Sequence, residues 1–254
     1  MALGIVIALI LFFLLLPTLI VIPVSFGKAP YIEFPPKGLT FHWYQLYFTD
    51  PDWIAATLFS MRIAAATTVT ATVIGTLASV ALVRGELPGK SLVLGLALSP
   101  LIVPHIVIAI GLYLFFAPLK LTGNFFGFLL AHSMLTVPYV VISVSAALQR
   151  FDPILEKAAL SCGAGRGRAF YAVVLPQITP AIVTGAVFAF VSSFDEATVA
   201  FFISGIEGKT ITRKLFEDID YNLTPVIAVV STVIVGISIA LMGAVRLSQR
   251  DEES

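Results

Sequence analysis

Residues 155–182 read LEKAALSCGAGRGRAFYAVVLPQITPAI and form a polar interruption between two long apolar segments. The stretch follows the pattern E-x-A-A-x3-G, then nine residues, then V-x-L-P, beginning at Glu156 and ending at Pro176. The polar region as a whole covers residues 150–172. A polar loop of that length in an otherwise apolar chain needs a functional reason, because connections in compact domains are mostly shorter.

Outside this stretch the chain is strongly apolar. It has 254 residues, of which 58% are hydrophobic and 12% charged, and its mean hydropathy is +1.00. These averages are typical of polytopic membrane proteins, and a helix needs about 20 apolar residues to cross the hydrocarbon core. The sequence therefore predicts an all-α integral membrane protein with six transmembrane helices, at residues 4–26, 53–83, 91–116, 124–148, 174–194 (with a continuation to 202 left open) and 221–245.

These segments divide the chain into three parts. Residues 1–52 hold the first helix and a polar external loop, residues 53–246 hold a five-helix core that includes the loop at 150–172, and residues 247–254 form a charged tail. The first segment has no basic flank and no small-residue cleavage pattern, so we expect a retained helix and not a cleaved signal peptide. An even number of helices places both termini on one side of the membrane. Basic residues favour the side of the polar loop, which indicates that this side is cytoplasmic.

The polar loop itself is predicted to contain a short helix followed by a sharp turn. Pro153 suits the first turn of a helix, and Asp152 before it is a suitable N-cap. Gly163 and Gly165 permit a sharp turn after the helix. Small side chains dominate one face, which would let the helix lie deep in a groove of a partner; the alternative is an ordinary amphipathic connector on the inner leaflet. The face comprises Leu155, Ala158, Ala159 and Cys162. Glu156 lies off this face, and we expect it to cap the helix or to pair locally with Arg166 or Arg168.

The whole pattern resembles the cytoplasmic coupling loop of permease subunits of bacterial ATP-binding-cassette (ABC) importers, whose usual form is E-A-A-x3-G-x9-I-x-L-P. One extra residue separates Glu156 from the alanine pair, and Val173 stands where isoleucine is commoner. The resemblance implies the type I ABC importer permease fold and a loop that docks in a cleft of a nucleotide-binding subunit. It assigns ATPase coupling to Leu155, Glu156, Ala158, Ala159, Gly163, Ala164, Phe170, Leu175 and Pro176.

The same resemblance implies a set of partners in the bacterial inner (plasma) membrane. A dimer of ABC ATPase subunits would bind ATP and magnesium, a second permease of related sequence would complete the path, and an external solute-binding protein would deliver the solute. We expect no catalytic residue, cofactor or metal site in this chain, since it has no G-x-x-x-x-G-K-[ST] phosphate loop and its one cysteine, Cys162, has no histidine beside it. The formal net charge of zero gives no indication of a nucleic-acid partner.

Two adjacent carboxylates, Asp195 and Glu196, fall near the outer end of the fifth predicted helix. Carboxylates at such a depth are costly unless they face water or a partner. They form either a cation-attracting rim on the translocation path or a solvated helix end paired with Arg62. The string SFDEATVAFFISG at 193–205, with TITRKLFEDI at 210–219, resembles spermidine/putrescine permeases and their opine-type relatives, which favours a cationic or zwitterionic solute. The path residues expected on this basis are Ser193, Asp195, Glu196 and Arg62.

Two other classes of function stay open at this point. Ion-coupled secondary transporters usually show two related halves with interrupted helices at the midplane, and no repeat is visible here. An intramembrane enzyme could use His105, His132 or a serine, but the sequence contains neither G-x-S-x-G nor H-E-x-x-H. The favoured interpretation is a non-catalytic permease subunit that forms half of the path of an ATP-driven importer of polyamines or related small solutes.

Overall fold

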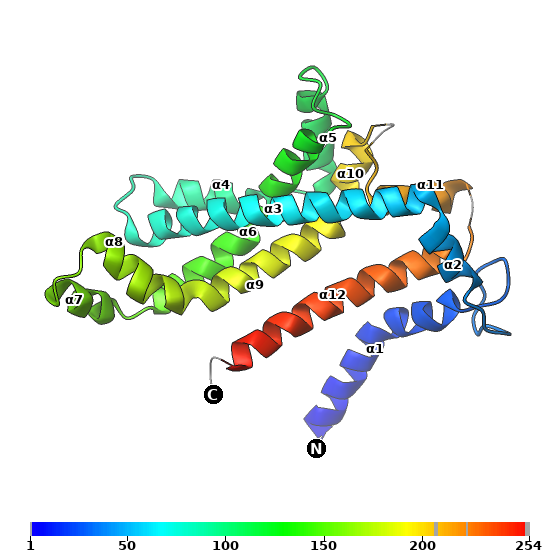
Figure 1. Ribbon diagram of the computed structural model, residues 1–254, viewed down its shortest axis with the longest axis horizontal. Helices are drawn as coiled ribbons and strands as arrows, with labels where there is room; N and C mark the ends of the chain where they lie inside the picture. The colour runs from blue at the N-terminus through cyan, green and yellow to red at the C-terminus, as the bar shows by residue number, and fades with distance from the viewer. Residues whose placement is uncertain (1, 206–207, 222, 252–254) are drawn as a thin grey trace. The chain divides into compact units, whose positions relative to one another are not determined.

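The computed structural model describes residues 2–205, 208–221 and 223–251, and these are almost entirely helical (Figure 1). Within the described chain one isolated bridge, between Gly27 and Leu39, is the only β-type pairing, and no strand forms. The chain divides into two compact units, and the division falls inside α3 and inside α12. This all-helical architecture agrees with the fold class that the sequence predicts.

The first unit consists of Met1–Phe59 and Lys209–Leu241. Its short helices are fastened to the longer ones by polar and aromatic contacts. Trp43 donates its indole N–H to the carbonyl of Gly27 at 2.9 Å, and the ammonium of Lys214 lies 5.2 Å from the centre of the Trp53 ring. The elements are α1 (Ala2–Ser25), α2 (His42–Thr49), the start of α3 (Pro51–Arg84), α11 (Ile211–Tyr221) and most of α12 (Val226–Asp251).

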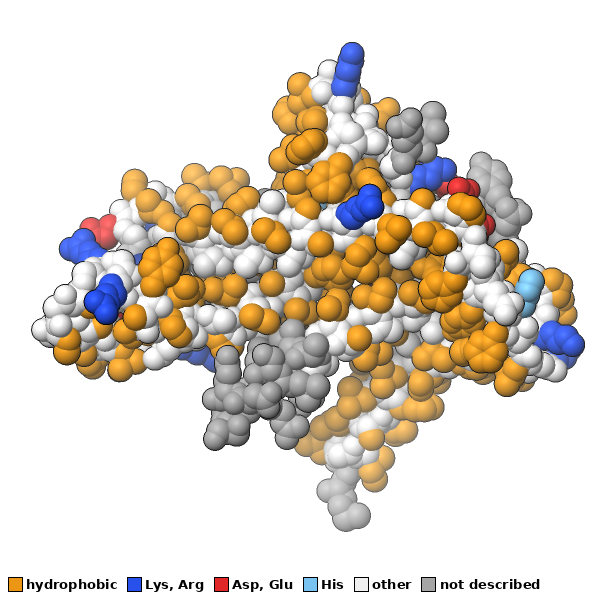
Figure 2. Space-filling model, viewed as in Figure 1, with side chains coloured by type: hydrophobic (Ala, Val, Ile, Leu, Met, Phe, Trp, Pro, Cys, Tyr) orange, Lys and Arg blue, Asp and Glu red, His pale blue; other side chains and the backbone are white. Residues whose placement is uncertain are grey.

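The second unit consists of Ser60–Gly208 and Met242–Ser254, and α6 is its central helix, packed along α9. In Figure 2 the visible face of its long helices is mostly apolar, and charged side chains gather at the turn after α3 and beyond it. The elements are the rest of α3, α4 (Lys90–Ile102), α5 (His105–Phe116), α6 (Phe125–Arg150), α7 (Pro153–Ser161), α8 (Arg166–Ala169), a π-helical turn (Phe170–Val174), α9 (Leu175–Phe194), α10 (Thr198–Ile203) and the end of α12.

Glycines bring three helices of this unit together around Val140 of α6. A Cβ atom added at Gly75 of α3 would lie 2.6 Å from the Cβ of Val140, and one added at Gly185 of α9 would lie 2.9 Å from its Cα. Neither position can therefore carry a side chain without moving α6. Small residues at helix contacts are the usual means of close approach in membranes, where lipid is as apolar as the side chains and packing supplies the attraction.

Hydrogen bonds between the same helices accompany this close approach. The hydroxyls of Thr70 on α3 and Ser133 on α6 lie 2.7 Å apart. Ser143 of α6 donates to the carbonyl of Ala181 on α9, also at 2.7 Å. Interhelical hydrogen bonds of this kind are worth about 0.6 kcal/mol on average in membrane bundles. Together with the glycine contacts they fix the register of α3, α6 and α9.

The predicted third span is broken in the structure. Five helices of the described chain are long and apolar enough to cross a membrane, and the count reaches six when α4 and α5 are taken as one span bent by 105°. The bend lies at Val103 and Pro104. Proline lacks an N–H and forces the preceding residue out of the helical region, and Val103 accordingly has an extended backbone (φ −75°, ψ 133°).

The fifth predicted span begins earlier than the sequence suggests. It runs without interruption from Arg166 to Phe194, through the π-helical turn at Phe170–Val174. Pro176 would clash with the carbonyl four residues before it in a regular α-helix, and this carbonyl, of Ala172, lies inside the π-helical turn. The helix then ends at Phe194, so α10 does not continue it. Of the predicted tail at 247–254, residues 247–251 belong to α12 and 252–254 lie outside the described residues.

We expect Gly75→Val and Gly185→Val each to lower the thermal unfolding temperature of the full chain in detergent. Overpacking a close helix contact costs about 1–3 kcal/mol. The matched control is Gly95→Val in α4, where an added Cβ meets nothing within 4 Å. Equal unfolding temperatures for the three variants would contradict the role assigned to the two glycines.

Candidate functional site

The helix α7 begins as the sequence predicts. The side chain of Asp152 accepts a hydrogen bond from the backbone N–H of Ile154 at 2.9 Å, and Pro153 occupies the first helical position. Both features favour the start of a helix at this point of the chain. Asp152 as N-cap and Pro153 in the first turn are therefore confirmed.

One face of α7 is exposed to solvent in the part of the chain that the structure describes. None of its residues is buried, and Leu155 keeps 43% of its surface exposed. Ala158 and Cys162 are also exposed, and Ala159 is half-buried. These are the four residues predicted to share the docking face. An uncovered helix with small and apolar side chains, at the end of a long bundle, is a surface that a partner can cover.

Gly163 makes the turn that follows α7. Its backbone has a φ of +86°, in the left-handed region that glycine adopts without strain. Directly after it, the N–H of Ala164 bonds to the carbonyl of Ala159 at 3.1 Å and closes the end of the helix. The chain therefore reverses direction at a fixed angle and enters α8. We refer to residues 152–176, from the cap of α7 to Pro176, as the elbow (Figure 1).

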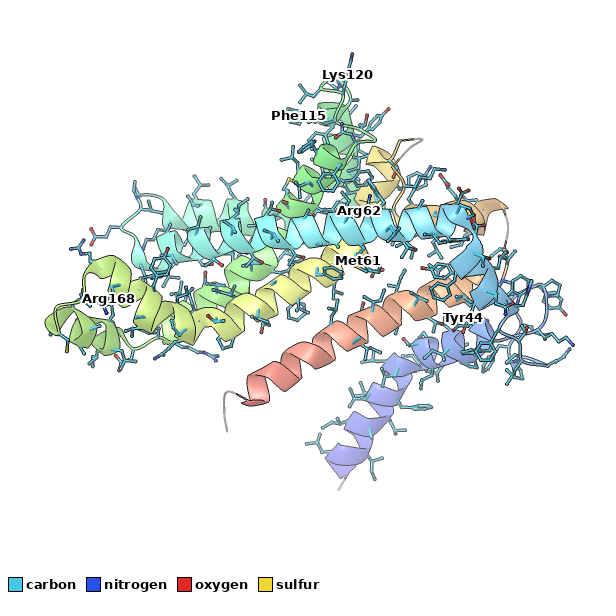
Figure 3. All side chains as sticks on the ribbon, in the orientation of Figure 1. Tyr44, Met61, Arg62, Phe115, Lys120 and Arg168 are labelled. Atoms are coloured by element: carbon cyan, nitrogen blue, oxygen red, sulfur yellow. The ribbon has the colours of Figure 1, made fainter. Side chains whose placement is uncertain are left out.

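The elbow is fastened to α3 through Glu156. Its carboxylate accepts a hydrogen bond from the guanidinium of Arg84, the last residue of α3, at 2.8 Å. The same guanidinium lies 5.1 Å from the centre of the Phe151 ring. The sequence suggested instead a local pairing with Arg166 or Arg168. That expectation is wrong, and the two arginines are exposed beyond the Gly163 turn, where Figure 3 shows Arg168 on α8.

The other side of the elbow enters the core of the second unit. Val174 and Ile178 belong to a cluster of buried apolar residues contributed by α3, α6 and α9, and Phe170 and Leu175 pack against that cluster. Pro176 stays exposed. Of the nine coupling residues named from the sequence, Phe170 and Leu175 thus anchor the elbow in the core and Glu156 bonds to α3. Leu155 and Ala158 of α7 are exposed.

A second candidate site lies at the break between α9 and α10. Asp195 and Glu196 line an open pocket of about 370 Å³, with Asp195 exposed and Glu196 buried. The rings of Tyr139 and Phe188 line it as well and stack with centroids 6.5 Å apart and an angle of 18° between their planes. Carboxylates beside aromatic faces are groups that attract organic cations. The full lining is His105, Tyr139, Phe188, Val191, Ser192, Asp195, Glu196, Ala197 and Thr198.

The other two residues expected on the path lie elsewhere. Ser193 is buried, and its hydroxyl is 2.9 Å from Nδ1 of His132 on α6, with which it forms a hydrogen bond. Its neighbour Ser192 lines the pocket instead. Arg62 is exposed on α3 (Figure 3), whereas the ring nitrogen Nδ1 of His105 lies 3.9 Å from the carboxylate of Glu196. The structure therefore brings together Asp195 and Glu196 of the four residues named.

No group of three or more histidine, cysteine or acidic residues that could hold a metal ion occurs in the part of the chain that the structure describes. The residues that sequence reasoning missed are Arg84, which holds the elbow, and Tyr139 and Phe188, which line the pocket. No spacing in the sequence links Arg84 to Glu156.

Comparisons with known proteins point to one family. The model of the family described as binding-protein-dependent transport system inner membrane component matches residues 71–251. The spermidine/putrescine transport system permease protein PotC of Haemophilus influenzae is 30% identical over 230 residues, which cover 91% of this chain and 89% of that protein.

Two solved structures share the fold. One is the crystal structure of a bacterial ABC transporter involved in the import of the acidic polysaccharide alginate. Its TM-score is 0.72 and its sequence identity 16%, and the match covers 98% of this chain and 94% of that chain. The other is a bacterial alginate ABC transporter in complex with a periplasmic protein bound to alginate pentasaccharide, with a TM-score of 0.70, 13% identity, and 97% and 93% covered. The predicted fold is thereby confirmed.

Arg84→Gln is expected to loosen α7 without unfolding the bundle. A part-exposed ion pair contributes little to global stability, so its loss should appear as local opening. Hydrogen exchange of peptides covering α7 should become several-fold faster, and Glu156→Gln should give the same result. The control is Arg168→Gln on the exposed surface of α8. The charge-swapped pair Arg84→Glu with Glu156→Arg should restore slow exchange; fast exchange in that double variant would contradict the attachment.

Proposed function

Because this chain belongs to the family of inner membrane components of binding-protein-dependent transport systems, it is a permease subunit of an ABC importer, and we propose that it forms half of a translocation path for polyamines or related cationic solutes. The observation that carries the proposal is the elbow, whose A-A-x3-G and V-x-L-P residues fall in register with the coupling loop of such permeases, with Glu156 displaced by one residue. The ion-coupled and enzymatic alternatives are not favoured, since the family consists of ABC importer permeases.

The elbow is proposed to dock in a cleft of an ABC ATPase subunit. Its uncovered face, with Leu155, Ala158 and Cys162 exposed, supports this role. Closure of the ATPase dimer would push on α7, and the push would reach α3 through Arg84 and reach α9 through Phe170 and Leu175. Gly163 fixes the angle between α7 and α8, so the elbow acts as a lever and not as a flexible tether.

The remaining partners follow from the same proposal. ATP and magnesium would be bound and ATP hydrolysed in the partner ATPase subunits, and this chain would perform no chemistry. A second permease of related sequence would supply the other half of the path. An external solute-binding protein would deliver the solute, as the periplasmic protein in complex with the alginate transporter supports.

The chain is a multi-pass protein of the inner membrane, as its family and its apolar helices indicate. We propose that both termini and the elbow lie in the cytoplasm. The lysine and arginine side chains expected on the opposite, external side are largely paired with acidic residues, which agrees with this orientation. Examples are the ion pairs Lys209–Glu217 at 2.8 Å and Lys214–Asp218 at 2.9 Å. The proposed parts stay those of the sequence: residues 1–52, the core 53–246 with its loop at 150–172, and the tail 247–254.

The pocket at the break between α9 and α10 is proposed as part of the translocation path. Its volume of about 370 Å³ lies within the range of small-molecule sites. Asp195 would attract an ammonium group, and the stacked rings of Tyr139 and Phe188 would take the methylene chain or the charge. Ser193 and Arg62 would contribute to the path from the surrounding helices and not from the pocket lining. Ser193 would do so through its hydrogen bond to His132.

Gly163→Val is expected to reduce the amount of ATPase subunit that co-purifies with the complex, and to abolish solute-stimulated ATP hydrolysis. A β-branched residue at positive φ is a genuine outlier, so the turn of the elbow would change. Gly167→Val in α8 is the matched control, because an added Cβ at either position meets nothing within 4 Å and Gly167 does not have a positive φ. Equal recovery and activity for both variants would refute the lever.

The solute class is tested by ATP hydrolysis of the reconstituted complex with its binding protein, screened across polyamines, opines and amino acids. We expect cationic solutes to stimulate hydrolysis, and we expect Asp195→Asn to raise their KM several-fold because the pocket loses its exposed charge. Stimulation by anionic solutes alone would overturn the assignment of a cationic solute while leaving the importer assignment intact.

A further inference from the structure

Two helix breaks of the second unit lie against one another. The first separates α4 from α5, whose axes differ by 105° at Val103 and Pro104. The second separates α9 from α10 and covers residues 195–197. Beyond the breaks, α5 and α10 pack against each other (Figure 1). We call these two helices the outer pair.

Glu196 connects the two breaks. The residue is buried, with 6% of its surface exposed. Its two carboxylate oxygens accept hydrogen bonds from the backbone N–H groups of Val199 (2.9 Å) and Ala200 (2.8 Å), in the first turn of α10. The same carboxylate lies 3.9 Å from Nδ1 of His105, the first residue of α5. Glu196 therefore caps α10 and contacts the start of α5 at once.

The outer pair is also fastened at its far end. The N–H of Gly123, in the turn after α5, donates to the carbonyl of Ile203, the last residue of α10, at 2.7 Å. A Cβ added at Gly205 would lie 2.8 Å from the Cα of Gly123. Backbone contacts this close leave no room for sliding. With Glu196 at one end and Gly123 at the other, α5 and α10 are held as one body.

Asp195 differs from Glu196 in its exposure and in its hydrogen bonds, although both line the pocket. Asp195 is exposed, lines the pocket, and its backbone N–H closes α9 by bonding to the carbonyl of Val191 at 3.0 Å. Glu196 lines the same pocket but turns its two oxygens to backbone N–H groups. If this buried carboxylate turned away toward a cation, it would leave those two N–H donors unpaired, which is costly.

We propose that Glu196 is a positioning residue, which holds α5 and α10 together so that they turn as one body about the two helix breaks, and that Asp195 is the carboxylate of this pair that meets solute. The inference rests on the proposed transport function and deepens it, because it divides two adjacent acids between structure and binding. During transport the outer pair then moves relative to the bundle of α3, α6 and α9, which the contacts of Gly75 and Gly185 with Val140 keep rigid.

The test compares Glu196→Gln with Asp195→Asn in the complete reconstituted complex with its binding protein. Glutamine retains one acceptor oxygen, so Glu196→Gln loses one cap bond and the charge facing His105. Loss of a helix cap corresponds to about a fivefold rise in local opening. We expect hydrogen exchange in α10 to become about fivefold faster and the maximal rate of spermidine-stimulated ATP hydrolysis to fall several-fold, with KM changed by less than about twofold.

Asp195→Asn is expected to do the reverse: KM for spermidine rises several-fold, while the maximal rate and exchange in α10 stay as in the wild type. Glu86→Gln, an exposed carboxylate in the turn between α3 and α4, is the control and should change neither quantity. His105→Ala should reproduce part of the loss in maximal rate and add little when combined with Glu196→Gln, since both remove the same contact.

The inference is overturned if Glu196→Gln raises KM while leaving the maximal rate and exchange in α10 unchanged, because Glu196 would then bind solute. It is also overturned if the effects of His105→Ala and Glu196→Gln on the maximal rate are fully additive. Failure of the transport assignment itself would look different, since no solute would then stimulate ATP hydrolysis by the wild-type complex; exchange in α10 of Glu196→Gln would still report on the cap.

Discussion

The contact of Val140 with two glycines is the constraint on which the second unit depends. Gly75 of α3 and Gly185 of α9 bring their backbones against α6, and no larger residue fits at either position without moving α6. Closely packed interfaces have discrete arrangements and do not deform continuously. The three helices therefore behave as a block, and any conformational change has to take place where the packing is interrupted.

The interruptions lie at the two ends of this block. At one end α7 touches the block through Arg84 and through the anchors Phe170 and Leu175, while its outer face has no protein cover. At the other end the breaks before α5 and before α10 interrupt the backbone of two spans. In the proposed coupling, a push on α7 would reach the closely packed helices first and the two helix breaks afterwards. This order suits a protein that converts motion of a partner into opening of a path.

Local features of the elbow could be predicted from the sequence, because neighbours in the chain determine them. Asp152 and Pro153 start a helix by capping chemistry, and Gly163 ends it by its tolerance of positive φ. Apolar length likewise predicted the spans. The break at Pro104 could not be located, since Pro100 lies four residues earlier in the same span and is accommodated within α4. A proline's effect depends on what packs around it, which sequence alone does not reveal.

Contacts between distant residues escaped prediction for the same reason. Glu156 was expected to pair with arginines close to it in the chain, yet it pairs with Arg84. Asp195 and Glu196 looked equivalent as adjacent acids and both line the pocket, but Asp195 is exposed there whereas Glu196 bonds to the backbone of α10. The direction of each side chain is set by the helix break, and the break is a property of the packed bundle.

The π-helical turn at Phe170–Val174 has a geometric consequence for the elbow. A π-turn accommodates one residue more than an α-turn, and one residue corresponds to a rotation of about 100° around the axis of an α-helix. The residues before it are thus out of phase with those after it, although the helix axis continues. A periodicity plot drawn through this span assigns α8 to the wrong azimuth. The direction in which α7 points around the axis of this span therefore depends on one additional residue ahead of Pro176.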